Sequence, residues 1–493
     1  MKTKTLVIGA GLSGLSAAAV LAKNGVDVQV FEKNREIGGR ARQFKQNGYV
    51  FDIGPSWYWM PDVIEKFFSY FDKKPSDYYQ LIKLDPSYRI YFSNDESLDV
   101  PGNLNELVRL FDHIEPGSGI KLTNFLKDAE YKYHFGMHEA VYKPAHSFTE
   151  FIDRKILLYA LKLDFLRSVS GVVRKNFKDK RLIQLLEFPV LFLGATPQNT
   201  PSLYSLMNYA DLVLGSWYPM GGMFKLIDAL YQLAGSYGVT FHTNAPVSEI
   251  IIKNKKACGL KVFDSIYTSD FVIGSADYHH IDNSLLPEAY RNYSEKYWHS
   301  RVMAPSALLI FLGVRKKLKG LLHHNIFFDT DFDQHAEDIY SKPKWPEEPA
   351  LYVSCTSKTD PGVAPPGCEN LVILIPIAPG LEDNDTIKEH YFRLAVKRFE
   401  TITGQSIIDD IDFKRIYSCS DFTRDYNSFK GNAYGLANIL WQTAFLKPKM
   451  KNRKVQNLFY SGQLTTPGPG IPPSIISGQV AALEILKKKN QKK

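Results

Sequence analysis

The fold of this chain is decided near its beginning by the stretch Lys4-Thr5-Leu6-Val7-Ile8-Gly9-Ala10-Gly11-Leu12-Ser13-Gly14-Leu15. An apolar run leads into three glycines spaced as G-x-G-x-x-G, and an alanine-rich segment with helical character follows. In such a turn Gly9 permits the tight bend, Gly11 lets the backbone approach a pyrophosphate, and Gly14 lets helix and strand pack closely. The spacing therefore predicts a βαβ dinucleotide-binding unit over residues 4–35.

An acidic residue follows this unit at the expected place. Glu32 ends the next apolar run, residues 28–31, where a carboxylate can accept hydrogen bonds from a ribose. The N-terminus of the intervening helix would offer free N–H groups and partial positive charge to the pyrophosphate. A signal peptide is the alternative, because Lys2 and Lys4 precede an apolar stretch. That alternative leaves the glycines and Glu32 without a role, so we adopt dinucleotide binding.

The composition bounds the class of protein. At 493 residues the chain is too long for one simple core, so two or three closely joined domains are expected. The four cysteines are scattered without a C-x-x-C pair, which favours a reducing compartment over a disulfide framework. The two histidine pairs are adjacent rather than spaced as metal ligands, and no metal site is expected.

The net charge of +8 is unevenly distributed. Basic residues gather at 487–493 and at 167–181, which is typical either of a solvated surface or of attraction to an anionic membrane. No nucleic-acid module accompanies them, so nucleic acid is not an expected partner. Residues 155–173 resemble an amphipathic helix that could lie in a bilayer interface or bury its apolar side in the protein. No apolar run of about 18 residues predicts a membrane-spanning helix.

Several later segments of the chain are predicted to join the dinucleotide-binding unit. Gly38-Gly39-Arg40 follows the ribose-binding acid, where close backbone approach and a guanidinium suit a second phosphate contact. Residues 271–277 read as a buried strand, and residues 457–463 read as another, followed by a Gly/Pro loop and a small-residue helix. The predicted architecture is an α/β fold in which a discontinuous Rossmann-type domain comprises residues 1–75, 216–295 and 440–493. Residues 76–215 and 296–439 form the predicted substrate domain, with candidate membrane-associating helices at about 150–185.

These motifs together resemble the bacterial carotenoid desaturase family, flavoproteins related to phytoene desaturase and more distantly to amine oxidases. Three elements narrow the resemblance to the carotenoid branch: Tyr218-Pro219-x-Gly221-Gly222-Met223, Ala364-Pro365-Pro366-Gly367 and Gly468-x-Gly470-Ile471-Pro472. Gln463-Leu464-Thr465 departs from the family pattern beside Gly462. The resemblance covers essentially the whole chain and implies FAD as cofactor in a glutathione-reductase-like domain.

The family resemblance also implies particular site residues. The implied FAD-binding residues are Gly9, Gly11, Leu12, Ser13, Gly14, Glu32, Lys33, Gly39, Arg40, Gly54, Pro55, Ser56, Val247, Asp277, Gly462, Gly470, Ile471 and Pro472. By local similarity, the catalytic candidates that handle protons are Glu150, Asp153 and Arg154. An apolar substrate needs an apolar cavity. Its candidate lining is Trp57, Tyr58, Trp59, Trp217, Tyr218, Trp441 and Phe445, and for each the alternative is an ordinary core position.

The implied reaction removes two hydrogens from adjacent carbons of a polyene, with the flavin as hydride acceptor. The expected activity is conversion of phytoene, a C40 carotenoid, to lycopene by successive dehydrogenations. A hydroxycarotenoid or later intermediate is the alternative substrate, and an amine oxidase or a non-catalytic lipid-binding protein is a more distant alternative. The expected partners are the carotenoid, a membrane surface, and quinone or oxygen as electron acceptor. The expected location is the cytoplasm, peripherally on the cytoplasmic membrane.

Overall fold

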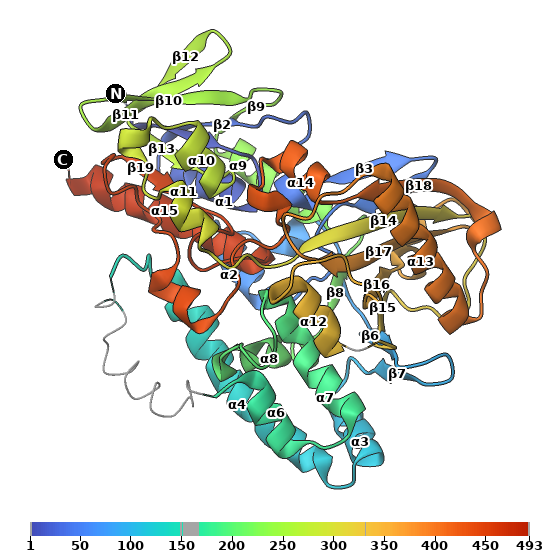
Figure 1. Ribbon diagram of the computed structural model, residues 1–493. Helices are drawn as coiled ribbons and strands as arrows, with labels where there is room; N and C mark the ends of the chain where they lie inside the picture. Colours follow the sequence, from blue (N-terminus) through green and yellow to red (C-terminus); the bar gives the residue numbers. More distant parts are fainter. Residues whose placement is uncertain (1, 148–149, 151–166, 331, 492–493) are drawn as a thin grey trace.

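A five-stranded parallel sheet carries the first motif of the chain. In the computed structural model, which describes residues 2–147, 150, 167–330 and 332–491, the strand order is β19-β13-β1-β2-β9. The strands are β1 (Lys4–Ile8), β2 (Asp27–Phe31), β9 (Thr240–His242), β13 (Phe271–Gly274) and β19 (Leu458–Tyr460). Helices α1 (Leu12–Lys23), α9 (Phe224–Ser236) and α15 (Ile471–Gln491) pack together on this sheet, and α1 contacts both others (Figure 1). The sheet therefore unites the beginning, middle and end of the chain.

A second, mixed sheet of seven strands has the order β18-β14-β17-β16-β15-β6-β7. These strands are β6 (Tyr88–Tyr91), β7 (Ser97–Val100), β14 (Ser306–Val314), β15 (His324–Phe327), β16 (Leu351–Ser354), β17 (Glu369–Ile377) and β18 (Ile411–Tyr417). Successive side chains of a strand point to opposite faces. Leu308 and Ile310 of β14 accordingly pack with α13 (Asp385–Thr403), whereas Leu309 and Phe311 join the core on the other face.

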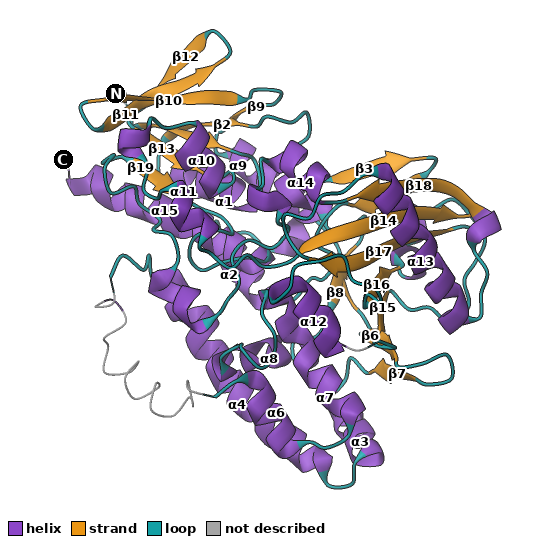
Figure 2. Cartoon of the chain, in the orientation of Figure 1, coloured by secondary structure: helices purple, strands orange, loops and turns teal. Residues whose placement is uncertain are grey.

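The remaining elements connect these sheets (Figure 2). A three-stranded antiparallel sheet of β10 (Val247–Lys253), β11 (Lys256–Val262) and β12 (Ser265–Thr268) stands beside the parallel sheet. Two short pairs are β3 (Gln43–Gln46) with β4 (Tyr49–Asp52) and β5 (Leu81–Lys83) with β8 (Trp217–Pro219). Other helices are α2 (Pro61–Ser69), α10 (Tyr278–Ser284), α11 (Glu295–His299), α12 (Phe332–Tyr340) and α14 (Cys419–Tyr426). The result is a mixed α/β fold.

A helical region formed by residues 104–147 and 167–212 extends away from both sheets (Figure 1). It contains α3 (Leu104–Ile114), α4 (Ser118–His138), α6 (Val169–Asn176), α7 (Lys180–Glu187) and α8 (Leu206–Leu212). Val169 and Val173 are fully buried, so this end of the predicted amphipathic stretch packs inside the protein; residues 151–166 lie outside the described part. Arg174 forms an ion pair with Glu187. Among the described helices, none is both long and apolar enough to cross a bilayer.

The predicted domain limits can be compared with the sheets. All five strands of the parallel sheet lie within residues 1–75, 216–295 and 440–493. All seven strands of the mixed sheet lie within 76–215 and 296–439. The short β5–β8 pair joins the two sets of segments, because β5 comes from the second and β8 from the first. The division of the chain at these limits otherwise stays a prediction.

Asp211 of α8 gives the helical region a predicted pH dependence. Its carboxylate accepts a hydrogen bond of 2.7 Å from the Tyr88 hydroxyl, and burial raises the pKa of Asp211 to about 7. The folded protein therefore holds a proton that the unfolded chain releases near pH 4, so stability falls as pH rises from 4 to 7. The loss is on the order of 4 kcal/mol, at 1.36 kcal/mol per pKa unit. Asp211→Asn cannot ionise and should flatten this slope.

Urea unfolding at pH 5, 6, 7 and 8 measures the effect of Asp211→Asn. The variant should gain stability relative to the wild type at pH 7 and above. The control is Asp95→Asn, because Asp95 is exposed between β6 and β7. Parallel pH profiles for the wild type and Asp211→Asn would contradict the assignment.

Candidate active site

A cavity of about 910 Å³ reaches from the parallel sheet to the mixed sheet. One part of it, here called the dinucleotide part, is lined by residues at the ends of β1 and β2 together with η1 (Gly39–Ala41) and the loop before α15. The other, here called the apolar part, is lined by α4, the 3-10 turn η6 (Ser202–Ser205), α8, β14 and β17. Its lining side chains are Phe135, Met137, Leu203, Leu206, Met207, Leu309 and Leu374. The two chemically different parts are continuous.

Close backbone contact between glycines forms the floor of the dinucleotide part. Gly9 turns the chain out of β1 with a φ of +100°, a conformation that favours glycine. A Cβ atom added at Gly39, whose φ is +55°, would lie 3.3 Å from the Cα of Gly11. Among the described residues no side chain caps α1, which begins at this floor. The exposed backbone here is what a phosphate group requires.

Glu32 is held in a fixed orientation at the end of β2. Its Oε2 accepts a hydrogen bond of 2.9 Å from the backbone N–H of Ala10, and its Oε1 accepts one of 3.0 Å from that of Asn34. The side chain is 6% exposed. The carboxyl ends of β1 and β2 lie at the same edge of the parallel sheet, so the acid stands beside the glycine floor.

Arg40 supplies positive charge next to the floor. Its Nη2 donates hydrogen bonds to Ser428 Oγ (2.6 Å) and to the Asn432 carbonyl (3.1 Å). Its buried Nε has no hydrogen-bond partner among the described residues. Burial lowers the pKa of Arg40, and the nearby Asp277 carboxylate opposes this shift. A glycine floor, an oriented acid and an incompletely satisfied guanidinium together fit the pyrophosphate and ribose of a dinucleotide.

All but one of the predicted FAD-binding residues line the cavity. Those that do are Gly9, Gly11, Leu12, Ser13, Glu32, Lys33, Gly39, Arg40, Gly54, Pro55, Ser56, Val247, Asp277, Gly462, Gly470, Ile471 and Pro472. Gly14 lies behind the floor, where an added Cβ would overlap the carbonyl oxygen of Gly9. Its lack of a side chain therefore serves the packing of α1 on β1.

The aromatic residues predicted for the substrate cavity divide into two groups. Trp57, Trp59 and Phe445 line the cavity, and the Trp57 ring stacks on His324 with 3.9 Å between centroids. The other four are absent from the described lining. Tyr58 and Tyr218 are buried in the core instead, where their hydroxyls bond to Tyr79 and Asp360.

Trp217 and Tyr218 belong to a short strand outside the described cavity lining. Residues 217–219 form β8, which pairs with β5, and Tyr218 there is 1% exposed. The indole N–H of Trp217 donates to the Leu214 carbonyl. Trp441 is 49% exposed, under the guanidinium of Arg301, and lies on the surface.

Of the predicted catalytic residues, only Glu150 lies in the described part of the chain. Its Oε1 accepts hydrogen bonds from the backbone N–H groups of His146 (2.9 Å) and Ser147 (3.2 Å), so it stabilises a local turn. It is not among the described residues that line the cavity. Asp153 and Arg154 lie outside the described residues.

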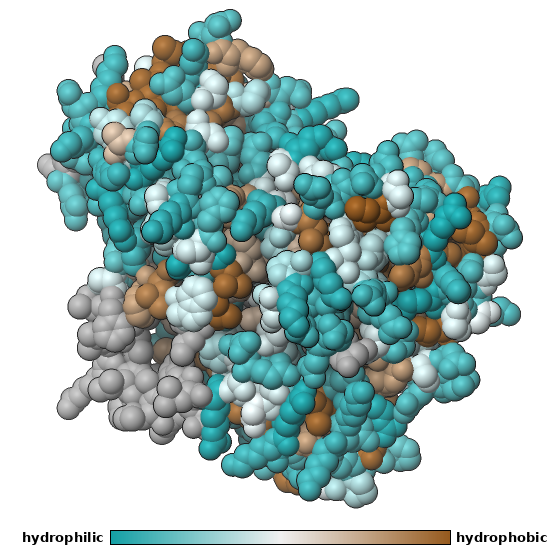
Figure 3. Space-filling view, viewed as in Figure 1, coloured by the Kyte–Doolittle hydropathy of each residue, from teal (hydrophilic) through white to brown (hydrophobic). Residues whose placement is uncertain are grey.

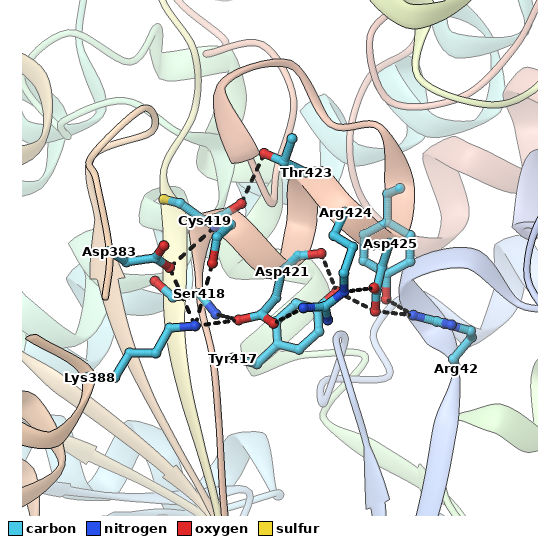
Figure 4. Close-up of polar contacts among 12 residues, drawn as sticks. Arg42, Asp383, Lys388, Tyr417, Ser418, Cys419, Asp421, Thr423, Arg424 and Asp425 are labelled. Carbon is cyan, nitrogen blue, oxygen red and sulfur yellow. Dashed lines mark hydrogen bonds and ion pairs between the residues drawn. The ribbon is translucent and has the colours of Figure 1, made fainter. Parts of the chain in front are cut away.

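Helix α14 closes the dinucleotide part, and sequence reasoning missed it. Asp425, Tyr426 and Asn427 line the cavity there. Asp425 accepts a hydrogen bond of 2.8 Å from Arg42 Nη2, and Asp421 pairs with Lys388 of α13 (Figure 4). Arg42 and Asp425 are 383 positions apart, so no local sequence signal could have revealed the contact.

Sequence reasoning also missed two hydroxyl groups that lie in the apolar part. The Tyr204 hydroxyl lies 2.7 Å from Thr443 Oγ1, and both residues line the cavity. Neither stands within a recognisable motif. The pair adds a small polar feature to an otherwise apolar surface.

Fold and cavity define a dinucleotide-binding protein in which an apolar part of the cavity adjoins the dinucleotide part. A family model described as flavin containing amine oxidoreductase matches residues 12–486. The carotenoid 3,4-desaturase of Haloarcula japonica is 40% identical over 477 residues, which are 97% of this chain and 96% of that protein. The 4,4'-diapophytoene desaturase (4,4'-diaponeurosporene-forming) of Staphylococcus haemolyticus is 32% identical over 492 residues, covering 97% and 98%.

Solved structures agree on the fold. An oxidoreductase from Methanosarcina mazei aligns with a TM-score of 0.65 at 17% identity, covering 98% of this chain and 100% of that one. The chain belongs to the flavin-containing amine oxidoreductase family, in its carotenoid desaturase branch, and is an FAD-dependent oxidoreductase.

Substitution of Gly39 tests the glycine floor. Gly39→Ala should abolish FAD binding, because the new methyl group would press against Gly11 and its φ of +55° would be strained. Gly25→Ala is a matched control: its φ is +71°, so it carries similar strain, but an added Cβ meets nothing within 4 Å. The measurement is flavin absorbance per mole of purified protein. Equal flavin content in the two variants would contradict the role of the floor.

Proposed function

We propose that this enzyme desaturates a long linear carotenoid, and the observation that carries the proposal is the continuity of the dinucleotide and apolar parts of one cavity. A polyene hydrocarbon has no polar handle, so apolar contact along its length must hold it. Phe135, Met137 and Leu206 supply such contact. FAD, when bound, supplies a hydride acceptor.

The chain's own residues would bind and orient both ligands. The backbone at Gly11 and Gly39, with Arg40, would hold the pyrophosphate, and Glu32 would hold the ribose. Trp57 and Trp59 line the cavity and would orient the polyene. Closure by α14 on one side and α4 on the other would exclude water from the reacting carbons.

The acids of the cavity argue against an amine substrate. An amine needs a carboxylate or an aromatic cage to hold its positive charge. Among described lining residues the acids are Glu32, Asp277 and Asp425, and all belong to the dinucleotide part. Each also has its own partner: Glu32 binds backbone N–H groups, Asp277 caps α10, and Asp425 pairs with Arg42. The described lining of the apolar part therefore offers an ammonium group no carboxylate, which favours a hydrocarbon, and Trp57 and Trp59 are among the aromatic side chains that line the cavity.

Two substrates fit the proposal. A later or hydroxylated carotenoid intermediate is favoured by the 40% identity to a protein named carotenoid 3,4-desaturase and by the Tyr204–Thr443 hydroxyl pair, which could bond to a substrate hydroxyl. Phytoene, converted to lycopene by successive dehydrogenations, is the other candidate, and the apolar lining supports it equally. Quinone or oxygen would reoxidise the flavin in either case.

We also propose that the enzyme works on the cytoplasmic membrane surface, because its substrate dissolves in the bilayer. Leu446 lines the cavity and is 43% exposed, and Trp441, five positions earlier in the chain, is 49% exposed, so this segment presents large apolar side chains to solvent. Figure 3 shows a largely hydrophilic face on which apolar residues gather only in small patches. A local contact of this kind would place the cavity mouth against lipid.

Pigment analysis tests the proposed reaction. The chain would be expressed in a carotenoid-free bacterial host supplied with phytoene synthesis, and in parallel hosts that make lycopene or a hydroxylated acyclic carotenoid. A product with additional conjugated double bonds is expected in at least one host, seen as a red-shifted absorbance. The host that gives product identifies the substrate.

The control for pigment analysis is Gly39→Ala, which should produce no pigment change. Unaltered pigments in every host, with yellow FAD-containing protein present, would overturn the proposed function.

Vesicle co-sedimentation tests the membrane contact. Replacing both Trp441 and Leu446 by Ser removes two large exposed apolar side chains, each worth about 1.5–3 kcal/mol when buried. Binding to anionic vesicles should weaken at least tenfold. The control is Ile266→Ser on β12, because Ile266 is 64% exposed but is not among the described cavity-lining residues. Equal binding by the two variants would refute this docking surface.

A further inference from the structure

Lys447 carries a buried amine that has no role in the binding of FAD or substrate described above. The residue is 2% exposed, and its Nζ has no hydrogen-bond partner among the described residues. An unpaired buried cation is costly for folding. Burying this amine lowers the stability of the folded protein, and a functional role would account for its presence.

Lys447 stands directly behind the loop that leads into α15. A Cβ added at Gly468 would lie 3.2 Å from Lys447 Nζ, so the missing side chain makes room for the amine. Pro467 and Pro469, on either side of this glycine, line the cavity. Thr465 Oγ1 donates a 2.6 Å hydrogen bond to the Pro448 carbonyl, which ties the lysine segment to the same loop.

The surroundings of the amine are neutral. A Cβ added at Gly468 would also lie 3.6 Å from Asn438 Oδ1, which belongs to an uncharged amide. Lys449, two residues along, directs its Nζ to the carbonyl oxygens of Ala145 and Phe445. Burial alone lowers the pKa of Lys447 to about 7, so the amine can gain or lose a proton near neutral pH.

The same loop ends at a helix N-terminus. Gly470, Ile471 and Pro472 at the start of α15 line the cavity, and a helix N-terminus favours negative charge nearby. We propose that Lys447 is a positioning residue whose amine takes up a proton when negative charge arises on the flavin, so that reduction and proton uptake are coupled. In a poorly screened interior such coupling acts without direct contact.

The step balances in atoms and electrons. Desaturation breaks two C–H bonds on adjacent carbons and forms one C=C π bond. One hydrogen leaves with two electrons to the flavin, and the other leaves as a proton. Uptake of one proton by the neutral Lys447 amine matches that release. Only the source of this proton rests on the proposed desaturation. The coupling between flavin reduction and proton uptake can be measured without a carotenoid.

The test is the midpoint potential of the FAD-loaded enzyme, measured by spectroelectrochemistry from pH 5.5 to 9 with no carotenoid present. For the wild type, the plot of midpoint potential against pH should become steeper above about pH 7, because reduction of the flavin is then accompanied by uptake of one more proton, at Lys447. Lys447→Met should lose this bend and have a lower potential below pH 7. Lys447→Arg stays charged and should lose the bend while keeping the higher potential.

Two further measurements separate function from folding. Lys447→Met should unfold no more easily than the wild type, because it removes an unpaired buried amine. Its flavin should bind sulfite on the order of tenfold more weakly at pH 6, because a nearby positive charge favours the negatively charged sulfite complex. Lys451→Met, in the same segment, should behave as wild type. Superimposable potential curves for the wild type and Lys447→Met, or a retained bend in Lys447→Arg, would overturn the proposal.

Discussion

The rest of the structure depends on the close approach of backbones where β1 turns into α1. Gly14 of α1 packs so tightly on Gly9 that a Cβ would overlap its carbonyl oxygen, and Gly9 in turn approaches the chain at Ser275 and Ala276 after β13. Three segments thereby meet with no side chain between them. Because this junction is bare backbone, the ends of the parallel strands are open to a ligand, and the cavity begins there.

The same cavity continues into a region of different physical origin. Its apolar part arises from the pleat of β14, whose alternate residues serve two cores: Leu308 and Ile310 pack with α13, while Leu309 faces the cavity. Alternate side chains of β14 thus belong to a hydrophobic core on one face and to the cavity lining on the other. Stability on the α13 side and the shape of the cavity on the other are set by different residues of one strand.

Features that depend on local backbone geometry could be predicted from the sequence. The glycine spacing, Glu32 at a strand end and the Gly/Pro loop before the last helix have local physical reasons, and these residues meet at one cavity. Aromatic residues could not be placed in this way, because a large apolar side chain satisfies a core and a cavity equally. Tyr218 is buried in the core, while Trp57 lines the cavity. The closure by α14 depends on a contact between residues 383 positions apart, which pattern reasoning does not reach.

The order of segments in the parallel sheet has a consequence for how the enzyme is made. Its edge strand β19 begins at Leu458, and α15, which packs on α1, begins at Ile471. During synthesis, β1 and α1 leave the ribosome long before β19 and α15, their partners in this domain, have been made. The dinucleotide part of the cavity is therefore incomplete until β19 and α15 have been made, and FAD binding has to follow their synthesis. Until then, the edge of β13 that pairs with β19 is an open strand edge that must be protected from other chains.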